Sequence, residues 1–246
     1  MPREHGAWGV LLIPFTIAAA VSGVFDLKVA LLLVSILCFY VARASYLKHS
    51  TKWVAILLAA SALCTVPLLV VWRLWWLIAF AALAAPLAFR KTERSTVAQL
   101  IAVCGLTLTA PAAWYAATGR IDPKALSLWL LNALYFGGGV FYVKMHVAAA
   151  MRKRPFESVR VKIAMGASTL FYHTGALVCL IVLAAEKTIP PVALVSYAPV
   201  AARAITGVAR LSPTLRIKRL GWTEVAHSVV FAITLIALLR WSHWSG

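Results

Sequence analysis

The chain has 246 residues, of which 63% are hydrophobic and only 13% are charged, and its mean hydropathy is +0.88. A soluble domain keeps about a quarter of its residues charged, so this composition excludes an ordinary soluble globular protein. The 24 Lys and Arg outnumber the 7 Asp and Glu, but they lie in short clusters between apolar stretches. That arrangement is typical of membrane topology and argues against nucleic-acid binding.

Nine apolar stretches are long enough, or nearly so, to cross a hydrocarbon core about 30 Å thick. We therefore predict an all-α, polytopic membrane protein, folded as one integral membrane domain over residues 1–246. The fourth stretch is the shortest. In chain order the predicted spans are residues 7–25, 27–46, 53–71, 74–89, 96–117, 125–150, 162–184, 188–208 and 221–241.

The basic residues predict the orientation of these spans. Counted on alternate sides of the membrane, 16 Lys and Arg fall on the side of the N-terminus and 6 on the other side, with two more inside spans. Because basic loops stay in the cytoplasm, we expect a cytoplasmic N-terminus and an external C-terminus. The four cysteines are expected to be small buried side chains: Cys38, Cys64, Cys104 and Cys179.

Ionisable residues inside the spans are costly unless they face a partner or a wet cavity. Most of them are predicted to lie in the cytoplasmic half, which suggests a cavity that opens inward. Structural roles stay open as alternatives: Lys144 reaching the headgroups, Arg203 and Glu224 forming an ion pair, and His173 bonding to a backbone carbonyl across a helix interface. The set comprises Lys144, His146, His173, Arg203, Glu224 and His227, with His5 at the start of the first span.

Four segments near the cytoplasmic ends carry a family resemblance: "PREHGAW" (Pro2–Trp8), "FYVK" (Phe141–Lys144) after three glycines, "YH" (Tyr172–His173) and "KRLGWTE" (Lys218–Glu224). With them the chain resembles the YwiC-like family of bacterial membrane proteins. This resemblance implies a location in the bacterial cytoplasmic (inner) membrane and names no biochemical activity.

The stretch Arg94–Asp122 is also distantly similar to the middle helix of UbiA-type prenyltransferases, where a small-residue helix ends in a Tyr-x-x-x-Gly turn. That similarity implies a nine-helix bundle around a cavity. Those enzymes use two Asp-rich motifs to hold magnesium, yet neither corresponding segment here, Ala42–Trp53 or Phe141–Pro155, contains a carboxylate. Because Mg²⁺ requires oxygen ligands, magnesium-dependent prenyl transfer is disfavoured, and we predict neither a metal nor another cofactor.

The first functional hypothesis is a cytoplasm-facing cavity that binds a lipidic, isoprenoid or quinone-like ligand with an anionic head. Whether the protein is an enzyme is left open; if it is, we expect a UbiA-like transferase. Proton transfer would then fall to Glu224, with His173 or His5. The candidate ligand-binding residues are Trp8, Lys48, Tyr142, Lys144, Arg152, Tyr172, Arg203 and Lys218.

Three alternatives remain beside this hypothesis. A transporter or permease would suit the intramembrane charges. Haem binding would use His173 and His227 as the iron ligands. An accessory subunit of a respiratory membrane complex would need no ligand site. Apart from the bilayer, the sequence predicts no partner and leaves the oligomeric state open.

Overall fold

The computed structural model describes residues 5–46, 51–89, 95–152, 156, 158–214 and 217–244, and within these ranges it leaves out the side chains of residues 5–6, 85–89 and 217–218. All regular structure in these ranges is helical. The elements are α1 (His5–Ser22), α2 (Leu27–Tyr46), α3 (Thr51–Val70), α4 (Trp76–Phe89), α5 (Thr96–Leu106), α6 (Thr109–Thr118), α7 (Pro123–Met151), α8 (Val159–Ala185), the 3₁₀ helix η1 (Pro191–Tyr197), α9 (Ala198–Ala209) and α10 (Ile217–Trp241).

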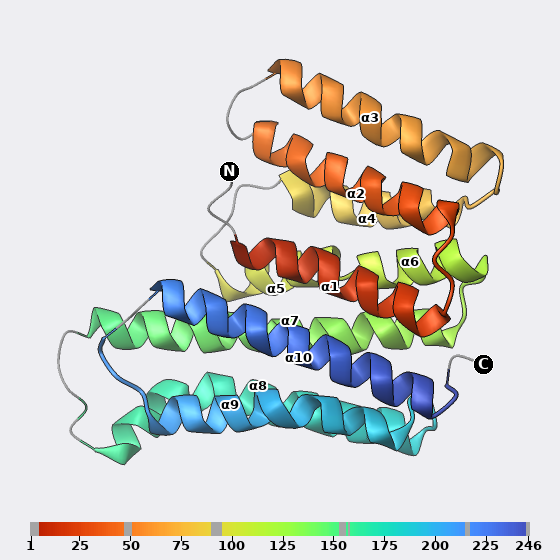
Figure 1. The fold of residues 1–246 in the computed structure, drawn as a ribbon. Helices are drawn as coiled ribbons and strands as arrows, with labels where there is room; N and C mark the ends of the chain where they lie inside the picture. Colours follow the sequence, from red (N-terminus) through yellow and green to blue (C-terminus); the bar gives the residue numbers. More distant parts are fainter. Residues whose placement is uncertain are drawn as a thin grey trace.

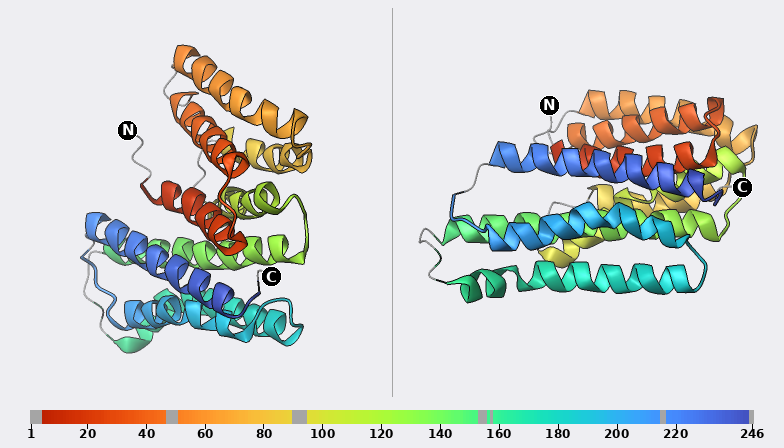
Figure 2. Two further views of the ribbon diagram at one scale, coloured as in Figure 1. Left: turned by 45° about the vertical axis from the view of Figure 1, so that its right-hand side comes forward. Right: turned by 60° about the horizontal axis from the view of Figure 1, so that its bottom comes forward.

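The helices lie along one common direction, and consecutive passes run antiparallel to each other (Figure 1). Consecutive α5 and α6 form one pass, as do η1 and α9, so the described chain makes nine passes. By length and composition, seven of these passes are able to cross a membrane, and α1 and α4 are shorter. Since α1 begins and α10 ends at opposite ends of the bundle (Figure 2), the odd number of passes agrees with the prediction. The chain is a multi-pass helical membrane protein.

Local sequence explains where several helices begin and end. The Ser95 side chain accepts a hydrogen bond from Ala98 N and caps α5, and Asp122 caps α7 in the same way, with Pro123 in its first turn. Gly119 ends α6 in the left-handed region at φ 71°, where its N–H bonds to Tyr115 O. The predicted Tyr-x-x-x-Gly turn is therefore present.

Two predicted spans are not continuous α-helices. The stretch 96–117 breaks between α5 and α6 around Thr107, four residues before Pro111, which has no N–H to bond back to that position. The stretch 188–208 begins as the 3₁₀ helix η1 after Pro190 and becomes α-helical only at Ala198. Pro199, in the first turn of α9, likewise has no N–H to bond back to Val195 O, and sequence hydropathy reveals neither break.

The core lies around α6, in which nine of ten residues are buried. Its alanines let α1, α2 and α7 approach closely, as small residues do in membrane bundles. The helices α2 and α3 pack along their length and are joined by hydroxyl groups: Ser35 Oγ lies 2.9 Å from Ser61 Oγ and 2.6 Å from Thr65 Oγ1.

Candidate functional site

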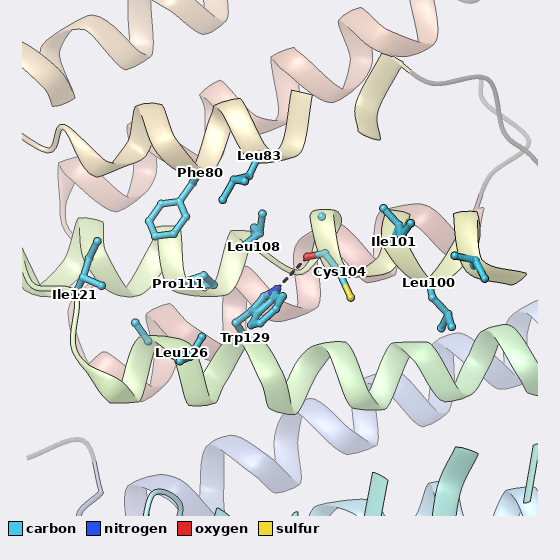
Figure 3. Close-up of a pocket in the computed structure, with 13 residues that line it drawn as sticks. Phe80, Leu83, Leu100, Ile101, Cys104, Leu108, Pro111, Ile121, Leu126 and Trp129 are labelled. Carbon is cyan, nitrogen blue, oxygen red and sulfur yellow. Dashed lines mark hydrogen bonds between the residues drawn. The ribbon is translucent and has the colours of Figure 1, made fainter. Parts of the chain in front are cut away.

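An apolar groove of about 620 Å³ lies between α4, α5, α6 and α7. Figure 3 shows Phe80 and Leu83 reaching from α4 toward Leu108 and Pro111, with Leu126 and Trp129 of α7 on the other side. The full lining is Phe80, Leu83, Val97, Leu100, Ile101, Cys104, Gly105, Leu108, Pro111, Ile121, Ala125, Leu126 and Trp129.

The break between α5 and α6 shapes the middle of this groove. There, the indole N–H of Trp129 donates to the backbone carbonyl of Cys104 at 2.9 Å, which leaves the face of the ring toward the groove (Figure 3). Cys104 itself is exposed and the other three cysteines are only half-buried, which corrects the prediction of four buried cysteines. The reason is that the groove removes the neighbours that would otherwise cover the thiol.

A cation lies at the α5 start of the groove. Lys144 Nζ of α7 donates to Thr96 Oγ1 at 2.7 Å, and Thr96 directly precedes the groove residue Val97. Lys144 therefore reaches across to the first residue of α5, and its predicted role of reaching the headgroups stays a prediction. The groove thus has apolar walls and a positive charge at one end.

A second polar region lies among α7, α9 and α10. Arg203 Nη1 donates to Glu224 Oε1 at 2.5 Å, and the guanidinium carbon lies 4.4 Å from the centre of the Tyr142 ring. Arg203 is buried and Glu224 is about a fifth exposed. The predicted alternative of an ion pair between these two helices is confirmed, and the ring of Tyr142 adds a cation–π contact.

The glycine run of α7 meets polar side chains from other helices. A Cβ at Gly137 would collide with the hydroxyl of Tyr172, one at Gly138 would lie 2.8 Å from His173 Nε2, and one at Gly139 would lie 3.4 Å from Glu224 Oε2. The three glycines therefore let α8 and α10 approach α7 closely. Only glycine leaves the room that Tyr172 and His173 occupy.

The histidines bond within their own helices. Nδ1 of His173 lies 2.8 Å from Thr169 O, and Nδ1 of His227 lies 2.7 Å from Thr223 O. The predicted carbonyl partner of His173 is thus found on α8 itself and not across a helix interface. These two hydrogen bonds do not test haem ligation by His173 and His227, so this pairing stays a prediction.

Two other candidates lie apart from both regions. The indole of Trp8 packs edge-on against Tyr40 at 4.8 Å, joining α1 to α2. The guanidinium of Arg152 lies 5.5 Å from the ring of Phe156. Three candidates lie outside what the structure describes: Lys48 entirely, and the side chains of His5 and Lys218.

The structure therefore brings together four predicted residues, Tyr142, His173, Arg203 and Glu224, and it places Lys144 at the groove. The groove itself was missed.

Comparison with known proteins bears on the first half of the chain. Residues 1–114 match the family model described as YwiC-like protein. The predicted resemblance is thereby confirmed for this part. The YwiC-like region contains α1 to α5 and the first part of α6, so it supplies the α4 and α5 walls of the groove, whereas the ion pair follows it. No curated protein and no solved structure matches the chain.

Proposed function

We propose that this membrane protein binds a lipidic molecule, isoprenoid or quinone-like, with its apolar tail in the groove between α4 and α7. The observation that carries the proposal is the groove's chemistry. Its walls are side chains of apolar residues together with Cys104 and Trp129, and its volume of about 620 Å³ lies within the range of small-molecule sites. A ligand without a long apolar part would gain no binding free energy by burial against these walls.

The position of the groove favours a ligand that arrives from the bilayer. Its α5, α6 and α7 walls belong to passes long enough to cross the membrane, and side chains such as Leu83, Val97 and Leu126 are more than half exposed on the surface of the bundle. The Trp129 indole has its N–H satisfied by Cys104 O, so the ring offers an apolar face. A hydrocarbon chain is the partner that suits such a surface.

The head group of the ligand is proposed to be anionic. Lys144 lies beside Thr96 at one end of the groove, and its positive charge would attract a phosphate or carboxylate there. By the positive-inside rule this end faces the cytoplasm, because α5 begins just after the basic cluster Arg90, Lys91 and Arg94. We accordingly propose an inner-membrane location with the N-terminus in the cytoplasm and the C-terminus outside.

The same proposal keeps a UbiA-like nine-pass bundle and leaves out magnesium-dependent prenyl transfer. The two segments that would carry the Asp-rich motifs contain basic residues and no carboxylate. Because a diphosphate held through Mg²⁺ needs such carboxylates, direct binding of an anionic head by cationic side chains fits this chain better. Binding, with or without later chemistry, is therefore the proposed activity.

The proposal is tested on protein purified in mild detergent. Lipids extracted from it are identified by mass spectrometry and compared with those that accompany an unrelated membrane protein from the same cells. We expect enrichment of one isoprenoid, quinone or anionic lipid at close to one molecule per chain. An extract no different from that of the control protein would exclude a bound lipidic ligand.

A further inference from the structure

A buried acceptor atom faces the glycine run of α7. Nδ1 of His173 lies 2.8 Å from the carbonyl oxygen of Thr169, and a carbonyl only accepts, so Nδ1 carries the hydrogen of the neutral ring. Nε2 then presents a lone pair toward Gly138. This atom is buried and has no hydrogen-bond partner among the described residues.

Other polar atoms of α8 and α9 are in the same condition. Thr169 Oγ1 and Arg203 Nε are buried and find no partner in the described part of the chain, and both side chains are more than nine-tenths buried. Such groups in native proteins are almost always hydrogen-bonded, to protein or to ordered water. A buried water molecule typically bonds to about three groups of this kind. We therefore expect ordered water molecules between α7, α8 and α9.

His173 and the ion pair approach neighbouring positions of one helix. His173 comes from α8 to Gly138, and Glu224 comes from α10 to Gly139, where its Oε2 would lie 3.4 Å from an added Cβ. Arg203 donates to the same Glu224 carboxyl group, so its charge also lies at this part of α7. Two glycines in sequence thus make room for a base and a carboxylate inside the membrane.

We propose that His173 and the Arg203–Glu224 pair form a hydrated proton-binding site within the bundle. A hydronium ion gives its proton to the Nε2 lone pair and is left as water; the imidazolium that results is stabilised by the Glu224 carboxylate. Carboxylates and histidines in transmembrane helices characteristically mark proton pathways. The site is separate from the groove and does not depend on the ligand proposed for it.

The charges around His173 fix the sign of a test. Tyrosines stay neutral between pH 5 and about 9, so Arg203 and Glu224 are the ions that act on it there. Glu224→Gln leaves the positive Arg203, which opposes protonation, whereas Arg203→Gln leaves the negative Glu224, which favours it. Among the described residues, Glu224 of α10 approaches the glycine next to the one that His173 approaches, and Arg203 of α9 is bonded to the same carboxyl group. The Tyr172 ring, on α8 itself, lies 5.9 Å from the His173 ring.

The experiment uses the full chain in lipid nanodiscs with ¹⁵N-labelled histidine. The ring-nitrogen shifts of His173 are followed between pH 5 and 9, with His227 as an internal control that has the same Nδ1 bond. In Glu224→Gln we expect the proton affinity of His173 to fall at least tenfold. In Arg203→Gln we expect it to rise, and in the double variant we expect it to return to the wild-type value. A His173 that does not titrate, or whose midpoint ignores both substitutions, overturns the proposal.

A second measurement needs no variant. In wild-type protein, magnetisation transfer from water is recorded to each histidine ring. We expect transfer to His173 Nε2 although its ring lies within the bundle. Failure of that transfer, while the partly exposed His227 shows it, would overturn the hydrated site even if the variants do not fold.

Discussion

Arg203 of α9 and Glu224 of α10 are joined by a 2.5 Å hydrogen-bonded ion pair between two helices that otherwise touch little. The guanidinium also contacts the face of the Tyr142 ring, so residues of α7, α9 and α10 meet at this positive charge. Removing one member of a buried pair leaves the other charge without compensation, whereas removing both does not. The pair is therefore expected to behave as a unit.

The first prediction concerns this pair. Arg203→Met is expected to lower the free energy of unfolding by about 3 kcal/mol, because Glu224 then keeps an uncompensated charge. The double variant Arg203→Met/Glu224→Leu is expected to recover most of that loss. Unfolding in mixed micelles with a rising fraction of SDS measures both. Additive losses in the double variant would mean that the two residues stabilise the bundle independently.

The second prediction concerns the glycine run. Gly138→Ala places a methyl group 2.8 Å from His173 Nε2, and since the ring is held by Thr169 O, we expect a loss of about 1–3 kcal/mol. Gly175→Ala on α8 is the matched control, because nothing lies within 4 Å of its Cβ. There, better helix propensity should leave stability equal or raised by up to about 1 kcal/mol. Equal behaviour of the two variants would contradict the close approach of α8 to α7.

The third prediction concerns the hydroxyl contacts between α2 and α3. Ser35→Ala removes the bonds to Ser61 and Thr65 and is expected to cost about 0.6–1.7 kcal/mol, as interhelical hydrogen bonds do in membranes. Thr16→Ala serves as control, since that hydroxyl bonds to Leu12 O in its own helix. A thermal melt of each variant separates them. If Thr16→Ala costs as much, the interhelical bonds carry no special weight.

The fourth prediction concerns pH and Asp26, in the connection before α2. Partial burial acts to raise the pKa of Asp26, but the Lys28 side chain at 3.1 Å and the N–H groups of Lys28 and Val29 outweigh it, so the pKa lies below 3.8. The carboxylate therefore stabilises the fold above its unfolded pKa, and this contribution disappears as the pH falls through the lowered folded value.

Because Asp26 is more than a third exposed, its contribution is expected to be only about 0.5 kcal/mol. Asp26→Asn keeps the cap and loses the charge. The melting temperatures of the two proteins should differ at pH 6 and converge below pH 4. A difference that persists unchanged to pH 3 would show that the charge is not its cause.

Much of the architecture could be predicted from the sequence because lipid imposes it. Apolar length marks each span, and every predicted span corresponds to one pass in the structure. The pairing of Arg203 with Glu224 was also foreseeable, since an intramembrane charge needs an opposite charge nearby. Each of these constraints can be recognised from a single residue or a single stretch of the sequence.

The groove could not be predicted in the same way. It depends on a helix break near Thr107, on the approach of α4 to α5, and on the turn of Trp129 toward Cys104 O. The break is local to Pro111, but the other two are relations between separate segments of the chain. Apolar residues that line a groove also look the same in sequence as those that face lipid. Lys144 illustrates this: its partner Thr96 lies 48 positions away.

The central claim is that the groove between α4 and α7 holds a lipidic ligand, and a substitution that fills the groove tests it most directly. Cys104→Trp places an indole beside Trp129 in the middle of the groove, whereas Leu63→Trp adds the same group on α3, at a side chain that is 76% exposed and outside the lining. Both variants and the wild type are purified in parallel, and bound lipid per chain is measured by mass spectrometry.

We predict that wild type and Leu63→Trp retain the same lipid in equal amounts, and that Cys104→Trp retains at most a tenth of it while keeping its melting temperature. Equal retention by all three proteins would contradict the groove as the binding site.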